Sequence, residues 1–144
     1  MASNPQHNGV QDVAIRYILE NSKVIAVVGM SRHKEKDAYS VPLYLLAQGY
    51  TVIPVNPSAK EIIGLKCYRS LSEIHTHVDV ALIFRPGNQV VPFVKEALKI
   101  GVKVIWMQEG IFNEEAALLA GERNIPCIMN RCIYKEHSKL VTSS

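Results

Sequence analysis

The sequence predicts a Rossmann-like three-layer α/β/α fold, with a mostly parallel sheet of five strands and room for a short extra strand. One reason is that short apolar runs, rich in Val and Ile, alternate with longer stretches of helical periodicity. Another is that a run such as residues 24–28 is apolar at every position, which is typical of strands buried on both faces. Parallel strands require crossover connections, and these supply the helical layers.

Five strands and five helices are predicted along the chain. The strands cover residues 24–28, 51–55, 79–84, 102–107 and 125–129. The helices cover residues 10–21, 38–48 and 88–100, a stretch that begins at residue 113, and residues 134–140. Helix ends are marked by Gly49 and Gly101 as left-handed terminators and by Asn88 and Asn113 as N-caps.

Two segments are described by weaker patterns. The first helix would bury the apolar residues that recur at spacings of three and four, namely Val10, Val13, Ala14, Tyr17 and Ile18. Residues 59–74 are the least regular part, for which we predict a short helical turn, a turn at Gly64 and a one-turn helix from Ser70.

Length and composition limit the function classes. The chain has 144 residues, of which 48% are hydrophobic and 20% charged, as expected for one domain. We predict a flexible tail over residues 1–9, a single domain over residues 10–140 and a second tail over residues 141–144. The net charge is only +3 and the basic residues are scattered, so no nucleic-acid partner is expected. No apolar stretch approaches ~18 residues, so no membrane span is expected.

The cysteines and histidines indicate neither a disulfide framework nor a metal site. Three cysteines are present and none belongs to a CxxC pair, which fits a reducing, cytoplasmic location. The N-terminus is polar and lacks the apolar core of a secretory signal. His33, His75 and His77 have no nearby carboxylate pair, so they are expected to be surface residues rather than metal ligands.

Small and polar residues gather where the predicted strands end. In open parallel sheets, ligands bind outside the carboxyl ends of the strands. Gly29 follows the first strand and lets a backbone or ligand approach closely, because it has no Cβ. Backbone amides, the Ser31 hydroxyl and a basic loop would then form a seat for phosphate. The alternative is a plain strand-to-helix turn with no ligand.

The sequence departs from the pattern of a dinucleotide site. No second or third glycine follows Gly29, and the second strand ends in Asn56 rather than in the acid that would bind a ribose diol. Lys60 either binds a phosphate on the ribose or is a solvated surface residue. Arg85 either contacts a ligand phosphate or pairs with an acid, and Trp106 is expected in the core rather than stacked on a ligand.

Several tracts resemble the small single-domain CoA-binding proteins, which are similar to the CoA-binding domain of the succinyl-CoA synthetase α subunit. The tracts are residues 29–31, 49–57, 106–110 and 130–132, followed by Glu136 and His137. The resemblance extends over residues 10–140. Many members have Ser where this chain has Ala38, and Asp where it has Asn130.

The resemblance implies coenzyme A, or an acyl-CoA, as the ligand. The CoA pyrophosphate would be bordered by Gly29, Met30, Ser31 and Arg32, and the adenosine with its 3′-phosphate by Asn56, Pro57 and Lys60. The adenine and ribose would be flanked by Arg85 and Pro86. The pantetheine arm would be bordered by Gln108, Glu109 and Gly110, and the far end of the site by Asn130 and Cys132. It does not imply the synthetase reaction, because the phosphohistidine domain and partner subunit of those enzymes have no counterpart here.

No catalytic set is evident, so a cytosolic CoA-binding module is the first hypothesis. The alternative is an NAD(P)- or other nucleotide-dependent enzyme on the same fold. The protein partner is not predicted, and the sequence leaves open a homodimer.

Overall fold

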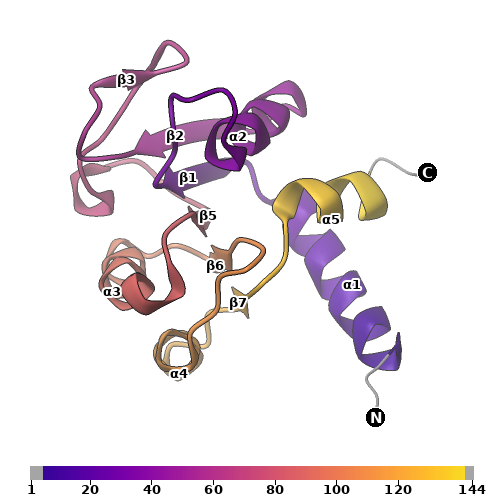
Figure 1. Ribbon diagram of the computed structural model, residues 1–144. Helices are drawn as coiled ribbons and strands as arrows, with labels where there is room; N and C mark the ends of the chain where they lie inside the picture. The colour runs from indigo at the N-terminus through magenta and orange to yellow at the C-terminus, as the bar shows by residue number, and fades with distance from the viewer. Residues whose placement is uncertain (1–4, 142–144) are drawn as a thin grey trace.

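A five-stranded parallel sheet forms the centre of the computed structural model, which describes residues 5–141 (Figure 1). Its strands lie in the order β2-β1-β5-β6-β7, and every neighbouring pair is parallel. They are β1 (Val24–Val28), β2 (Thr51–Val55), β5 (Val80–Ile83), β6 (Val104–Met107) and β7 (Cys127–Ile128). The predicted fold class is confirmed.

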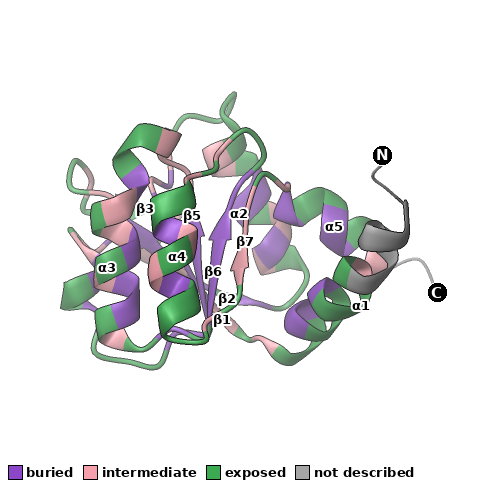
Figure 2. Ribbon diagram, turned by 90° about the horizontal axis from the view of Figure 1, so that it is seen from below, coloured by how far each residue is buried: buried purple, intermediate pink, exposed green. Residues whose placement is uncertain are grey.

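Helices cover both faces of this sheet (Figure 2). One layer contains α1 (Pro5–Asn21), α2 (Asp37–Ala47) and α5 (Ile133–Leu140). The other contains α3 (Val90–Ile100), α4 (Glu114–Glu122) and the 3-10 turn η1 (Leu71–Glu73). A second 3-10 turn, η2 (Gly87–Gln89), leads into α3.

The central strands are buried on both faces, as their uninterrupted apolar runs predict. In β1, Ile25 and Val27 pack into the core beneath α1, α2 and α5, whereas Ala26 and Val28 pack toward α3 and α4. Trp106 is fully buried and its indole N–H donates to the Arg131 carbonyl at 2.8 Å. The prediction that it belongs to the core is confirmed.

The predicted buried face of the first helix is confirmed at Ile18 and wrong at Val13, Ala14 and Tyr17. Ile15, Ile18 and Leu19 are buried, while Val13 and Tyr17 are 72% and 68% exposed. The helix carries two overlapping apolar stripes, and contact with α5 and with Tyr50, whose hydroxyl donates to the Leu19 carbonyl, selects the second stripe. The helix also begins at Pro5, within the predicted tail, while residues 1–4 and 142–144 lie outside the described residues.

The irregular segment contains a hairpin where a helical turn was predicted. Strands β3 (Glu61–Ile62) and β4 (Leu65–Lys66) pair antiparallel across a two-residue turn, in which Ile63 and Gly64 both have positive φ. Such turns suit the twist of hairpins, which a helical reading of the segment overlooks. The Gly64 turn and the one-turn helix after Ser70 are confirmed.

Helix starts after β5 and β6 differ. Asn113 caps α4 as predicted, because its side chain accepts from the Ala116 amide at 2.9 Å. Asn88 does not cap α3, since it lies inside η2 and α3 begins two residues later without a side-chain cap. Gly101 ends α3 in the predicted left-handed conformation.

The strand order places a switch point between β1 and β5. From β1 the chain runs through α2 on one face to β2, whereas β5 continues through α3 on the other face to β6. Because connections leave in opposite directions, the carboxyl ends of β1 and β5 border a crevice, which is where ligands bind in such sheets.

Candidate functional site

Two adjoining cavities open at the carboxyl edge of the sheet, across the switch point. The wide cleft has a volume of about 900 Å³ and lies between α2, α5 and the ends of β5 and β6. The corner pocket has a volume of about 370 Å³ and lies at the ends of β1 and β2. Ala38 and Phe84 line both cavities, so together they form one groove.

Gly29 has a structural role at the corner pocket. Its φ is +86°, and a Cβ placed on it would lie 2.7 Å from the Phe84 carbonyl oxygen. The glycine is therefore needed for the close approach of the β1 and β5 ends, before any ligand is considered. The predicted close approach of a ligand to Gly29 stays a prediction.

Two backbone amides of the turn that follows β1 are already hydrogen-bonded within the protein. The Gly29 amide donates to the Val55 carbonyl at 2.9 Å, and the Ser31 amide donates to the Ala38 carbonyl at 3.0 Å. Ala38 can accept this bond because Pro42, four residues on, has no N–H to donate to it. The Ser31 hydroxyl accepts from the His33 amide at 3.0 Å. The Gly29 and Ser31 amides are therefore engaged, whereas the Ser31 hydroxyl keeps its own hydrogen to donate, and the phosphate seat at this turn stays a prediction.

In the described part of the chain, the start of α2 offers free backbone N–H donors, whereas those of Gly29 and Ser31 in the turn after β1 are engaged. Among the described residues, no acceptor is bonded to the amides of Asp37 and Ala38, which belong to the first turn of this helix. Arg32, His33 and Lys36 line the adjoining pocket, and none of them pairs with an acidic group within residues 5–141. A helix N-terminus beside basic side chains attracts phosphate. The Asp37 carboxylate belongs to the same helix turn, but it lines the wide cleft and not the corner pocket.

Asn56 and Met30 fasten two strand ends together. The Asn56 amide nitrogen donates to the Met30 carbonyl at 2.8 Å, and its oxygen accepts from the Ser58 amide at 2.8 Å. Asn56 still lines the corner pocket, but its side chain is engaged by the protein itself. The Met30 side chain is fully buried in the core, so only its backbone reaches this edge.

Pro57 and Lys60 line a neighbouring depression of about 400 Å³, together with Lys66 and Arg69 from the segment that follows. This depression adjoins the corner pocket, because Ser58 and Ala59 line both, so the predicted contact of Pro57 and Lys60 with the ligand stays a prediction. The basic residues that do face the corner pocket come from the loop before α2 instead. The basic composition of the loop around Arg32 and Lys36 can be read from the sequence. The spacing of these residues does not show which of their side chains face the groove.

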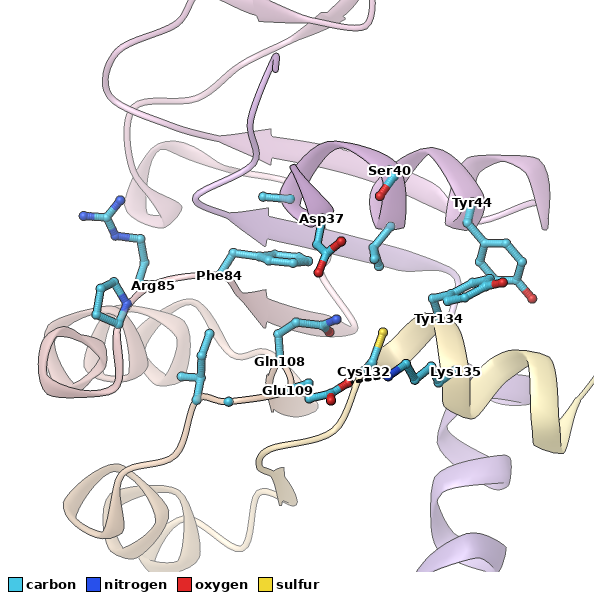
Figure 3. A pocket seen from close by; sticks show the side chains of 15 residues that line it. Asp37, Ser40, Tyr44, Phe84, Arg85, Gln108, Glu109, Cys132, Tyr134 and Lys135 are labelled. Carbon is cyan, nitrogen blue, oxygen red and sulfur yellow. Dashed lines mark hydrogen bonds and ion pairs between the residues drawn. The ribbon is translucent and has the colours of Figure 1, made fainter. Parts of the chain in front are cut away.

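Arg85 and Pro86 line the wide cleft at one end (Figure 3). The Arg85 guanidinium donates to the Gln89 side chain at 3.1 Å and lies over the Phe93 ring at 5.9 Å. No acid pairs with Arg85 among the described residues, so the interpretation that this arginine pairs with an acidic neighbour is wrong. Its Nε is buried without a hydrogen-bond partner, which is consistent with a donor that meets a ligand.

Gln108 lines the wide cleft, and Asn130 lies beside it. The Gln108 side-chain oxygen accepts from the Ile133 amide at 3.1 Å, which fixes the start of α5. The Asn130 side chain accepts from the Gly110 amide at 2.7 Å and joins the loops after β6 and β7. Asn130 lines a neighbouring cavity of about 560 Å³ rather than the wide cleft.

Cys132 and Glu109 line both the wide cleft and this neighbouring cavity. Cys132 is 8% exposed, immediately precedes α5, and directs its sulfur into the cleft (Figure 3). The Glu109 carboxylate forms an ion pair with Lys135 at 2.9 Å. Glu136 and His137 belong to the packing of α5, where Glu136 pairs with Arg131 at 3.3 Å.

Sequence reasoning missed the contribution of two helices to the cleft. Asp37, Val41 and Tyr44 lie along one face of α2, at helical spacing. Tyr134 and Lys135 belong to the first turn of α5. The spacing in α2 was a readable signal. Which face turns toward the strand ends could not be read, because it depends on how the helix packs.

Other site classes find no support in residues 5–141. No group of three His, Cys, Asp or Glu residues is arranged there to hold a metal ion. None of the helices in this range combines the length and apolar character of a membrane-spanning helix.

Comparison with known proteins gives the family. The CoA binding domain family matches residues 23–138. The uncharacterized protein YneT of Bacillus subtilis is 37% identical over 124 residues, which cover 86% of this chain and 92% of YneT. An ADP-forming acetate–CoA ligase of Methanocaldococcus jannaschii is 32% identical over 93 residues, but these cover 65% of this chain and only 13% of the ligase.

A solved structure agrees with this result. A hypothetical protein from Pyrococcus horikoshii OT3 superposes with a TM-score of 0.88 at 41% identity, covering 90% of this chain and 92% of that protein. The sequence match, the fold and the position of the groove are consistent with each other, and the chain belongs to the CoA binding domain family.

Proposed function

We propose that this protein binds coenzyme A or an acyl-CoA in the groove formed by the corner pocket and the wide cleft. The observation that carries the proposal is the continuity of these cavities past Ala38 and Phe84. CoA is a long ligand with an anionic nucleotide at one end and a largely neutral pantetheine arm at the other. A basic pocket at a helix N-terminus that opens into a larger cleft matches this division of charge.

The adenosine phosphates would lie in the corner pocket. The α2 amides of Asp37 and Ala38 and the side chains of Arg32 and Lys36 would donate to phosphate oxygens. The pantetheine arm would pass between Ala38 and Phe84 and end near Gln108 and Cys132. Relatives named as acetate–CoA ligases, which act on CoA, support the same ligand.

The proposed role is binding, in a reducing cytosolic compartment. All three cysteines are unpaired in the structure, which supports that location. An NAD(P)-dependent function is the weaker candidate, because the end of β2 offers the engaged amide of Asn56 where an acid would bind a ribose diol.

Calorimetry with CoA, dephospho-CoA, pantetheine and NAD tests the proposal. We expect CoA to bind more tightly than dephospho-CoA, and pantetheine and NAD to bind at least tenfold more weakly than CoA. Equal affinity for CoA and NAD would contradict the proposal.

A substitution at the junction of the cavities tests the continuous groove. Ala38→Leu places a larger side chain where the two cavities meet and should weaken CoA binding by tenfold or more. Ala14→Leu is the matched control, because Ala14 lies on the exposed side of α1. If Ala38→Leu binds CoA as the native protein does, the ligand does not cross this junction.

A further inference from the structure

The wide cleft has an aromatic end between α2 and α5 that a bare pantetheine arm does not require. We define the tyrosine end as Val41, Tyr44 and Tyr134, which line the cleft near Cys132. We propose that this end binds the acyl group of an acyl-CoA, and that the acyl groups it accepts are short and uncharged. The inference rests on the proposed function and adds the class of acyl ligand.

The tyrosine end is a rigid surface rather than two loose side chains. The Tyr44 and Tyr134 rings meet edge to face, with centroids 4.6 Å apart and planes at 85°. The Tyr44 hydroxyl is hydrogen-bonded to Nδ1 of the buried His137 at 2.8 Å. His137 in turn packs against the Tyr50 ring at 5.7 Å. The wall that faces the cleft is therefore fixed from the core outward.

This surface is apolar and uncovered. Tyr134 is 42% exposed although it belongs to a helix that is otherwise docked on the domain. Because the Tyr44 hydroxyl is already bonded, the side that remains for a ligand is its ring. Apolar surface of this kind gains free energy when an apolar group covers it.

The position of the tyrosine end suits the end of a bound cofactor. A ligand that enters from the corner pocket passes Ala38 and Phe84, and Arg85 lies at the opposite end of the wide cleft (Figure 3). Gln108 and Cys132 lie between Phe84 and Tyr134, and the Gln108 amide points into the cleft (Figure 3). A thioester near these residues would direct its acyl group toward the tyrosines.

The charges near this end select against acidic acyl groups. The charged residues that line the α2–α5 side of the cleft are Asp37, Glu109 and Lys135, which give a net formal charge of −1. The Lys135 ammonium pairs with the Glu109 carboxylate at 2.9 Å, which leaves Asp37 as the acid of this side that has no paired cation among the described residues. A succinyl or malonyl group would meet uncompensated negative charge, whereas an acetyl or butyryl group would not.

Calorimetry with CoA, acetyl-CoA, butyryl-CoA and succinyl-CoA tests this proposal on one protein preparation. Each methylene that becomes buried should tighten binding by up to about fourfold. We therefore expect butyryl-CoA to bind at least fivefold more tightly than CoA, and succinyl-CoA to bind at least fivefold more weakly than butyryl-CoA. Equal affinities for CoA and butyryl-CoA would overturn the acyl assignment while the CoA site stands. Failure of all four ligands to bind would overturn the proposed function itself.

Variants locate the effect. Tyr134→Ala should bring butyryl-CoA to within twofold of CoA on the same variant, because the ring that would cover the acyl group is removed. Tyr44→Phe keeps the ring and should retain the preference for butyryl-CoA. Tyr17→Ala is the matched control, since this tyrosine is 68% exposed on α1. If Tyr134→Ala keeps the full preference, the acyl group lies elsewhere.

Discussion

At the amino edge of the sheet, the buried carboxylate of Asp79 binds neighbouring strand ends together. At the carboxyl edge, the strand ends surround an open groove. The Asp79 carboxylate accepts from the amides of Lys23 at 2.8 Å and Val24 at 2.9 Å, and contacts His77 at 2.6 Å. The backbone carbonyl of Asp79 accepts from the amides of Lys103 and Val104, each at 3.0 Å. One residue thereby joins β1, β5 and β6.

The carboxyl edge uses small residues and amides instead of a central charge. Gly29 lets β1 approach β5, Asn56 joins the ends of β1 and β2, and Gln108 and Asn130 join the loops after β6 to those after β7. These contacts lie at the rims of the cavities and leave the interior of the groove open. Residues that line the groove can therefore also hold the strand ends together.

The largest expected effect concerns Gly29. Gly29→Ala combines a positive φ with a Cβ at 2.7 Å from the Phe84 carbonyl, so the protein should lose about 3 kcal/mol of stability or more. Gly49→Ala is the control: its φ is +99° but nothing lies within 4 Å, so the cost should be only about 1–2 kcal/mol. Urea unfolding measures both. Equal losses would show that the Phe84 contact is unimportant.

At the amino edge, Asp79→Asn should cost about 2–3 kcal/mol, because a carboxamide leaves part of this donor cluster without an acceptor. Affinity for CoA should not change, since Asp79 lies at the far edge of the sheet from the groove. Chemical unfolding and calorimetry on the same variant separate the two properties. A selective loss of CoA affinity with unchanged stability would contradict the division between the edges.

The pH dependence of stability should distinguish the two regions as well. Burial lowers the pKa of His137, so the unfolded chain takes up this proton first, at about pH 6.5. The stability contribution of neutral His137 is complete above that pH and is lost as the pH falls toward the lower pKa of the folded state. His137→Gln should flatten the unfolding free energy in this interval.

A second loss should follow below about pH 4. Burial alone would raise the pKa of Asp79, but the hydrogen bonds from the Lys23 and Val24 amides and from His77 outweigh it, so the pKa is lowered. Its contribution is present above the unfolded pKa and disappears as the pH falls through the folded one. Asp79→Asn should remove this second decline and leave the first. A profile that is unaffected by either substitution would contradict both assignments.

The smallest expected effect compares two lysines. Lys36 lines the corner pocket itself, whereas Lys60 lines the depression next to it. Lys36→Ala should weaken CoA binding about two- to fivefold at low salt, and by less at high salt, because exposed charges are screened. Lys60→Ala should change the affinity less than twofold. A larger effect at Lys60 would return the ribose phosphate to the position that the sequence suggested.

The order and type of nearly every helix and strand could be predicted from the sequence. Apolar runs such as β1 leave no face for water, and the end signals at Gly101 and Asn113 act through backbone geometry of neighbouring residues. These are local effects, so the sequence contains them directly. The family resemblance and the carboxyl-edge location of the groove follow from the same information.

The hydrogen-bond partners of the residues at that edge, and the buried face of α1, depend on tertiary structure. Local spacing cannot show that the Ser31 amide is bonded to Ala38, that Asn56 is engaged by Met30, or that α1 buries Ile15 rather than Val13. Each of these outcomes depends on partners that are distant in sequence or on which helix face docks. Hydrogen-bonding groups and apolar stripes offer several pairings of similar energy, and only the packed arrangement of the sheet and its helices selects among them.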